Sequence, residues 1–145
     1  MKKLLKIIGV LAVLGILAAA YVWFFIYNKP HEDYEKADPD FVMSAEACYK
    51  HFVTAKEGDE MYTGKVLEIN GIPSHVEDRD SLVILAFVFN EGMFGEEGIR
   101  CTMLPKYQEQ TLALDLSRGL HIKGFCSGYN DTDVILEYCS ITNKQ

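Results

Sequence analysis

Few cysteines and histidines and a deficit of positive charge limit what this 145-residue chain can do. The four cysteines form no C-x-x-C pair and have no cysteine–histidine spacing typical of zinc sites, so we expect no metal and no other cofactor. The first cysteine is Cys48, which excludes a lipid-modified cysteine near the N-terminus as an anchor. No nucleophile and base stand at catalytic spacing, so we do not expect an enzyme.

Positive charge is scarcest in the part of the chain that follows Asn28. That part holds 11 of the 14 Lys and Arg residues and all 21 Asp and Glu residues, a net charge of −10. This negative charge repels the phosphate backbone of nucleic acids, which counts against a nucleic-acid partner. The glycine-rich stretch 90–98 lacks the Lys-Ser/Thr ending of a phosphate-binding loop, and its glutamates would repel phosphate.

A long apolar run opens the chain and predicts a single transmembrane helix. Residues 4–27 contain one charge, Lys6, and 21 uncharged residues follow it. At about 1.5 Å per residue these span roughly 30 Å, the thickness of the hydrocarbon core of a bilayer. Lys2, Lys3 and Lys6 predict a cytoplasmic N-terminus, a single-pass anchor in the inner membrane and a domain in the periplasm or outside the cell.

The alternative for this run is a cleaved signal peptide, because Ala18, Ala19 and Ala20 could supply the small residues of a cleavage site. The apolar run continues past them to Tyr27, as in an uncleaved anchor, and we favour the anchor. Residues 28–40 are polar, with two prolines, and predict an extended linker over residues 28–43. Residues 44–145 are long enough for one modest domain.

Periodicity within residues 44–145 predicts a mainly β domain with two helices. Ser44 is the expected N-cap of the first helix, and Gly58 and Asp59 are expected to end it. Gly71 predicts a sharp bend in a long first strand. A tight turn at residues 130–132 joins the last two strands into an antiparallel hairpin. The expected helices cover residues 44–56 and 105–116, and the expected strands cover residues 63–76, 81–89, 99–103, 120–128 and 133–142.

Alternation within the hairpin predicts which of its side chains enter the core. The expected core-facing residues are Ile122, Gly124, Cys126, Ile135, Cys139 and Ile141. The order helix, three strands, helix, two strands is the layout of an OB-fold, a five-stranded Greek-key barrel. The predicted fold class is therefore mainly β with helices: a five-stranded OB-fold barrel preceded by a helix and by a single N-terminal transmembrane helix.

Five segments carry a resemblance to a known family. They are residues 28–40 (N-K-P-H-E-D-Y-E-K-A-D-P-D), 44–46 (S-A-E), 62–71 (Y-T-G-K-V-L-E-I-N-G), 99–103 (I-R-C-T-M) and 122–139 (I-K-G-F-C-S-G-Y-N-D-T-D-V-I-L-E-Y-C). Through them the chain resembles the tRNA_anti-like family of OB-fold proteins, which are membrane-anchored or exported bacterial proteins. The family name implies similarity to the anticodon-binding OB domain of tRNA synthetases, and such a likeness of fold does not imply function.

The OB layout also indicates where a ligand would bind. OB-folds use the outer face of strands two and three, with the loops between strands one and two and between strands four and five. The residues in those places that are able to stack on a base or bind a phosphate are His75, Arg79, Arg100 and Tyr129. Because many acidic residues surround them, we favour the interpretation that they form an ordinary barrel rim.

Export of the domain would permit disulfides. Strands three and five are neighbours in an OB barrel, and Cys101 and Cys139 lie late in these strands, so a Cys101–Cys139 bridge is the expected pairing. The alternative that all four cysteines are buried thiols stays open.

The sequence leaves two functions in competition. The first is a membrane-anchored, non-enzymatic OB module that contacts a protein, peptide or glycan of the cell envelope. The second is an OB-fold protein that binds tRNA or single-stranded DNA. The negative charge and the predicted location outside the cytoplasm favour the first.

Overall fold

The computed structural model describes residues 1–27, 33–55 and 57–142 of the 145-residue chain. The chain divides into two compact units, Met1–Glu32 and Asp33–Gln145. Residues 28–32 of the predicted linker lie outside the described residues, as do residue 56 of the first predicted helix and residues 143–145 at the C-terminus.

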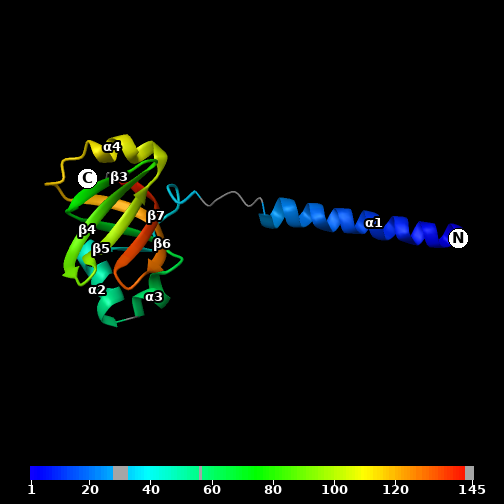
Figure 1. The fold of residues 1–145 in the computed structure, drawn as a ribbon, viewed down its shortest axis with the longest axis horizontal. Coiled ribbons are helices and arrows are strands. Elements are labelled where there is room, and N and C mark those ends of the chain that lie inside the picture. Colours follow the sequence, from blue (N-terminus) through cyan, green and yellow to red (C-terminus); the bar gives the residue numbers. More distant parts are fainter. Residues whose placement is uncertain (28–32, 56, 143–145) are drawn as a thin grey trace. The chain divides into compact units, whose positions relative to one another are not determined.

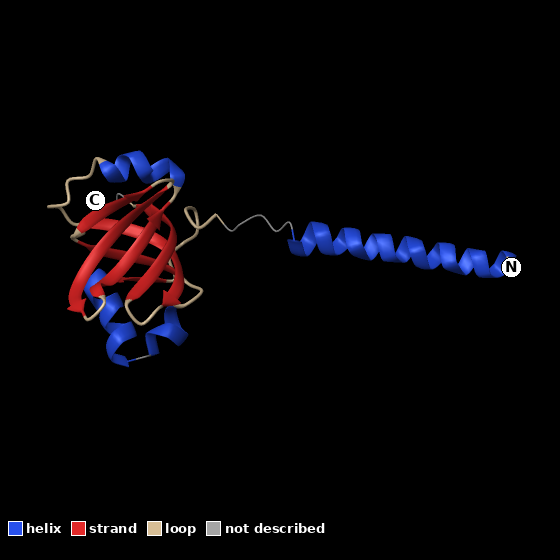
Figure 2. Cartoon of the chain, in the orientation of Figure 1, coloured by secondary structure: helices blue, strands red, loops and turns tan. Residues whose placement is uncertain are grey.

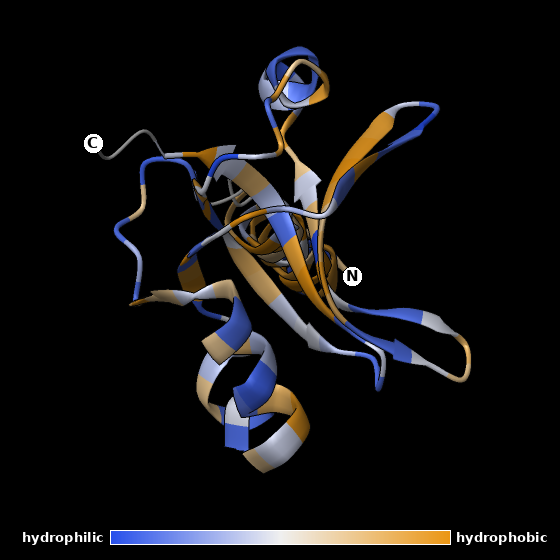
Figure 3. Cartoon of the chain, turned by 90° about the vertical axis from the view of Figure 1, so that its left-hand side faces the viewer, coloured by the Kyte–Doolittle hydropathy of each residue, from blue (hydrophilic) through white to orange (hydrophobic). Residues whose placement is uncertain are grey.

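The described part of unit 1, residues 1–27, is a single apolar helix. Helix α1 (Lys2–Val22) continues into a short π-helical segment, η1 (Trp23–Tyr27). Together they are long and apolar enough to cross a membrane, which supports the predicted membrane anchor. None of their residues is buried, and Figure 3 shows the helix end-on as mostly hydrophobic. The Trp23 and Tyr27 rings stack with centroids 5.5 Å apart, at the end where interfacial aromatic residues are common.

Unit 2 is built on one seven-stranded sheet with the strand order β1-β2-β6-β7-β5-β4-β3. Its helices are α2 (Ala45–Ala55), α3 (Glu57–Tyr62), the 3₁₀ helix η2 (Pro105–Tyr107) and α4 (Gln108–Leu112). Its strands are β1 (Phe41–Ser44), β2 (Val66–Gly71), β3 (His75–Arg79), β4 (Leu82–Gly92), β5 (Gly95–Met103), β6 (Leu120–Tyr129) and β7 (Asp133–Ile141). Helices α2 and α3 lie at one end of the strands and α4 at the opposite end (Figures 1 and 2).

The predicted five-stranded barrel is wrong in strand number and in closure. The expected first strand breaks after Gly71 into β2 and β3, because Pro73 has no N–H to donate to a ladder. β2 pairs with β6, and β3 pairs with β4. β1 is an additional strand that pairs in parallel with β2. Among the described residues no ladder joins β1 to β3, so the sheet is not closed.

Residues 33–44, most of which were predicted to form an extended linker, instead fold onto unit 2. Lys123 donates a hydrogen bond of 2.6 Å from Nζ to the backbone carbonyl of Glu35. The Tyr34 ring stacks on Tyr138 with centroids 5.3 Å apart. Strand β1 then extends the sheet. The folded part of the chain therefore begins before residue 44.

Other element boundaries differ from prediction in smaller ways. Ser44 caps α2 as predicted, accepting the Ala47 N–H at 3.2 Å. Helix α3 was not predicted, because Gly58 was interpreted as the end of the preceding helix. Residues 90–98 form the tip of the β4–β5 hairpin, so that β4 continues to Gly92 and β5 begins at Gly95 rather than at the predicted Ile99. In place of the predicted helix 105–116, the structure has η2 followed by α4, which ends at Leu112.

The buried residues of the hairpin reveal one error of register, in β7. Ile135 is half-buried, whereas its neighbours Val134 and Leu136 are fully buried. Tyr138, at φ 54°, occupies an irregularity of the β5–β7 and β6–β7 ladders, and beyond it Cys139 faces the core again. The core positions that are confirmed are Ile122, Gly124, Cys126, Cys139 and Ile141.

All four cysteines are free thiols buried in this core. Cys101 and Cys139 share a side-chain hydrogen bond and are not joined by the predicted disulfide. The β5–β7 register places Cys139 opposite Met103 rather than opposite Cys101. Burial raises the pKa of Cys48 to about 12 and that of Cys126 to about 11. The reactive thiolate is therefore scarce at neutral pH.

Thiol counting tests this arrangement. We expect none of the four cysteines to react with a thiol reagent at pH 8 in the folded protein, because each is buried and burial raises the pKa of Cys48, Cys126 and Cys139. All four should react after unfolding in denaturant without reductant. Fewer than four reactive thiols in the unfolded chain would establish a disulfide, and rapid reaction of the folded protein would contradict the burial.

Candidate functional site

Two of the predicted site residues, His75 and Arg79, flank a glutamate that the sequence did not single out. His75, Glu77 and Arg79 alternate along β3 and therefore project from the same face of the sheet. Arg79 Nη2 lies 2.7 Å from Glu77 Oε2. His75 Nε2 lies 3.4 Å from Glu77 Oε1. The alternation was visible in the sequence and could have identified Glu77 as their partner.

A third predicted residue, Arg100, joins them from β5. Its Nη1 forms an ion pair with Glu77, and its Nε lies 3.3 Å from Asp133 Oδ2 on β7. The side chains of Glu77, Arg100 and Asp133 are only 17%, 21% and 14% exposed. Partial burial lowers the screening of these pairs by water. The Glu77 cluster, as we name it, consists of His75, Glu77, Arg79, Arg100 and Asp133.

The Glu77 cluster borders a shallow hollow of about 330 Å³ on the outer face of the sheet. The hollow is lined by Glu77, Arg79, Ile84, Arg100, Thr102, Asp133 and Ile135. Its two guanidinium groups already pair with Glu77 and Asp133, and Glu96 lies 3.6 Å from His75. A phosphate at these arginines would also meet Glu77 and Asp133, whose two negative charges balance the two positive charges of the hollow. Direct binding of a polyanion is therefore disfavoured.

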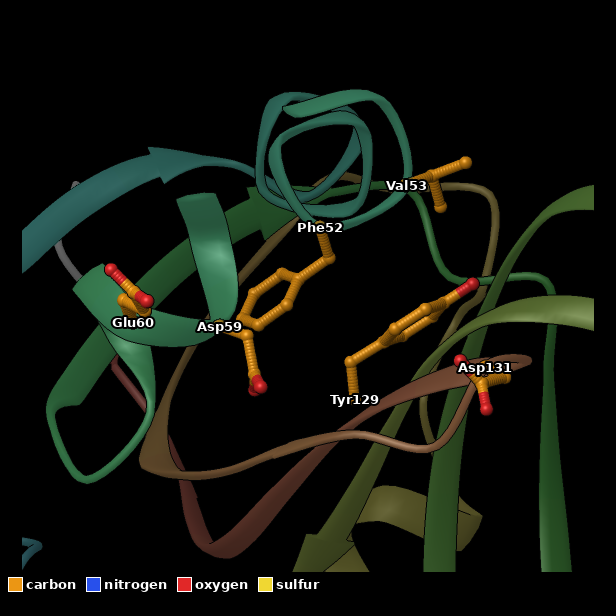
Figure 4. A pocket seen from close by; sticks show the side chains of 6 residues that line it. All are labelled: Phe52, Val53, Asp59, Glu60, Tyr129 and Asp131. Atoms are coloured by element: carbon orange, nitrogen blue, oxygen red, sulfur yellow. The ribbon is translucent and has the colours of Figure 1, made fainter. Parts of the chain in front are cut away.

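The fourth predicted residue, Tyr129, is not part of the Glu77 cluster. It lies at the end of β6, where its ring faces Phe52 of α2 with centroids 6.0 Å apart. The two rings line a second pocket, of about 490 Å³, beside α2, α3 and the β6–β7 turn (Figure 4). The residues that line this acidic-aromatic pocket are Phe52, Val53, Asp59, Glu60, Tyr129 and Asp131.

Local backbone structure places the acidic residues around this pocket. Asp131 lies in the β6–β7 turn at φ 69°, a left-handed conformation that Asp and Asn tolerate better than most residues. Asn130 Oδ1 accepts the backbone N–H groups of Thr132 and Asp133 at 3.1 and 2.7 Å, which stabilises the turn. Asp59 and Glu60 of α3 lie on the other side of the pocket.

The sequence offered only weak signals for this second pocket. Phe52 belongs to the apolar stripe of the predicted first helix, and nothing in that stripe distinguishes it from a core residue. Asp59 was interpreted, with Gly58, as the end of the first helix, and Glu60 was assigned to no element, because α3 was not predicted. Within the described part of the chain, no group of three or more His, Cys, Asp and Glu side chains is arranged to hold a metal ion.

Comparison with known protein families identifies the family of the chain. A family model described as tRNA_anti-like matches residues 1–141, which include α1 and every strand of the sheet. No curated protein matches the chain.

Proposed function

The chain belongs to the tRNA_anti-like family, and on that premise we propose that it is a membrane-anchored, non-enzymatic OB-fold module that binds a partner in the bacterial cell envelope. The observation that carries the proposal is the combination of an exposed, membrane-length helix with a domain whose outer arginines are already neutralised. The helix would hold the domain at a membrane, and the paired arginines disfavour a polyanionic ligand.

The strand order supports an OB-type fold. When β2 and β3 are taken as the two halves of one bent strand and β1 as an addition, that strand contacts β4 through one half and β6 through the other. The remaining order, β4-β5-β7-β6, is that of the OB Greek key, and α4 lies between the third and fourth of its strands. The sheet itself stays open, and the OB assignment therefore rests on topology and on the family.

The charge distribution of the N-terminal segment supports a location and an orientation in the membrane. Lys2, Lys3 and Lys6 are the only charged side chains before residue 29. The positive-inside rule then places the N-terminus in the cytoplasm, the helix in the inner membrane and unit 2 in the periplasm or outside the cell. A partner in that compartment would be an envelope protein, a peptide or a glycan.

The second function, binding of tRNA or single-stranded DNA, is the one that the family name suggests. Sequence-tolerant OB sites combine aromatic platforms with a basic channel. Here Tyr129 lies in a pocket bordered by carboxylates, and Arg79 and Arg100 contact Glu77. We therefore place this function second.

Crosslinking in the native membrane tests the proposal. A photoreactive amino acid at Thr102, in the hollow beside the Glu77 cluster, should crosslink the full-length protein to an envelope protein or glycan. A matched probe at exposed Ser117, in the loop after α4, serves as the control and should give no such product. Crosslinks to nucleic acid alone would overturn the proposal in favour of the second function.

A further inference from the structure

The acidic-aromatic pocket differs chemically from the Glu77 cluster. Phe52 and Tyr129 form its aromatic lining, with ring centroids 6.0 Å apart, and Phe52 is only 2% exposed, so Tyr129 offers the more accessible ring. Asp59 and Glu60 lie on one side of the pocket and Asp131 on the other (Figure 4). The negative face of an aromatic ring attracts a cation, and carboxylates accept hydrogen bonds from it. A cavity with this lining favours a positively charged group and repels an anion.

The carboxylates of this pocket are not neutralised by the described part of the chain. Within residues 1–27, 33–55 and 57–142, no Lys, Arg or His forms an ion pair with Asp59, Glu60 or Asp131, in contrast to the carboxylates of the Glu77 cluster. Asp59 Oδ1 accepts a hydrogen bond of 2.8 Å from Thr63 Oγ1, which orients it without cancelling its charge. Glu60 and Asp131 are exposed at the pocket and have no ion-pair partner among the residues that the structure describes.

The pKa of Tyr129 reflects the burial and the negative charge at the pocket. Burial raises its pKa above the ordinary value, and the charges of Glu97, Asp131 and Asp133 raise it further. Its phenol therefore stays neutral at physiological pH and keeps its O–H available as a donor or acceptor. Its ring keeps the electron-rich face that a cation prefers.

We propose that the acidic-aromatic pocket binds the ammonium group of a lysine side chain from a peptide segment of the partner. An ammonium group has three donors and no acceptor, which suits a pocket whose polar groups are mainly carboxylates. Exposed Val53 offers an apolar surface for the methylene groups of the lysine stem. This inference rests on the proposed binding function and names the partner chemistry that it requires.

The test uses the full-length protein in nanodiscs of zwitterionic lipid, so that a cationic peptide does not bind the membrane itself. The probe is a fluorescein-labelled peptide with three lysines separated by Gly-Ser spacers, and binding is followed by anisotropy. We expect saturable binding that is lost when the lysines are acetylated. Asp131→Asn and Glu60→Gln should each weaken it by about tenfold, because each removes one carboxylate from the cation.

The variants are chosen to leave the fold intact. Asn is favoured at the left-handed φ of residue 131, so Asp131→Asn keeps the turn and removes only the charge. Asp78→Asn makes the same change of net charge on exposed β3, away from the pocket, and should change the affinity by less than twofold. Circular dichroism of each variant confirms that the sheet is retained.

Three results would overturn the assignment. The first is that the lysine peptide does not bind at concentrations up to about 1 mM, because we expect a dissociation constant of roughly 10⁻³ M or lower for such a cation site. The second is equal weakening by Asp131→Asn and Asp78→Asn, which would indicate only long-range charge. The third is tighter binding of free spermidine than of the peptide, which would point to a small polyamine. Each leaves the crosslinking test from Thr102 unaffected, so failure of the pocket assignment is distinguishable from failure of the proposed function.

Discussion

Leu136→Ala is expected to lower the free energy of unfolding by about 2–5 kcal/mol, whereas Ile135→Ala should lower it by only about 1 kcal/mol. Leu136 is fully buried in the core, so its truncation removes apolar burial and leaves a cavity. Ile135 is half-buried at the hollow beside the Glu77 cluster, so much of its side chain is in water already. Urea denaturation of residues 33–145, which contain the complete core, measures both effects.

The pair of variants is its own matched control, because the two residues are adjacent isomers truncated to the same side chain. Since successive residues of a strand face opposite sides, a shift of one residue in β7 would exchange their effects. A larger loss from Ile135→Ala than from Leu136→Ala would therefore contradict the register described here. It would favour the register that alternation alone predicted.

Two arginines in the middle of α1 are expected to abolish membrane insertion. Moving an arginine to the centre of a membrane helix costs about 2.5–3.5 kcal/mol, and a leucine there contributes about −0.3 to −0.6 kcal/mol. Leu11→Arg combined with Leu14→Arg should therefore disfavour insertion by roughly 6–8 kcal/mol. Extraction of membranes with alkaline carbonate measures the result: the wild-type protein should stay in the pellet and the double variant should move to the supernatant.

The control for the anchor places the same two charges on unit 2. Leu82→Arg combined with Leu112→Arg alters two leucines that are 48% and 51% exposed, and this variant should remain in the pellet. Retention of the Leu11→Arg/Leu14→Arg variant in the pellet would mean that something other than α1 holds the protein on the membrane. A mature wild-type N-terminus at Tyr21 would instead show that the segment is a cleaved signal.

Local patterns were sufficient to predict the elements whose side chains alternate cleanly. The β6–β7 hairpin, its turn and the bend after Gly71 follow from period-two alternation and from residues that break strands. The same alternation failed in β7 at Tyr138, because the irregularity there resets the phase and nothing in the residue type signals it. Strand β1 was missed because its neighbours are polar and its partner β2 is more than 20 residues away.

The candidate site, too, could be predicted from the sequence only in part. Arg79 and Arg100 were identified by residue type, and the Arg79–Glu77 pair lies within β3, where alternation could have revealed it. Arg100, in contrast, is neutralised by Glu77 of β3 and Asp133 of β7, two strands other than its own. Pairing across three strands is a property of tertiary structure and cannot be read from spacing along the chain. The acidic-aromatic pocket depends likewise on α3, a short helix at a place where the sequence predicted the end of the preceding helix.

The central claim, that this domain serves a partner other than nucleic acid, is tested most directly by fluorescence anisotropy. Full-length protein in zwitterionic nanodiscs is titrated into labelled single-stranded DNA and tRNA at about 150 mM salt. Because Arg79 and Arg100 are paired with carboxylates and unit 2 is strongly acidic, we predict nothing tighter than the non-specific range of roughly 10⁻⁴ M. A micromolar or tighter complex that Arg79→Ala or Arg100→Ala weakens would contradict the claim.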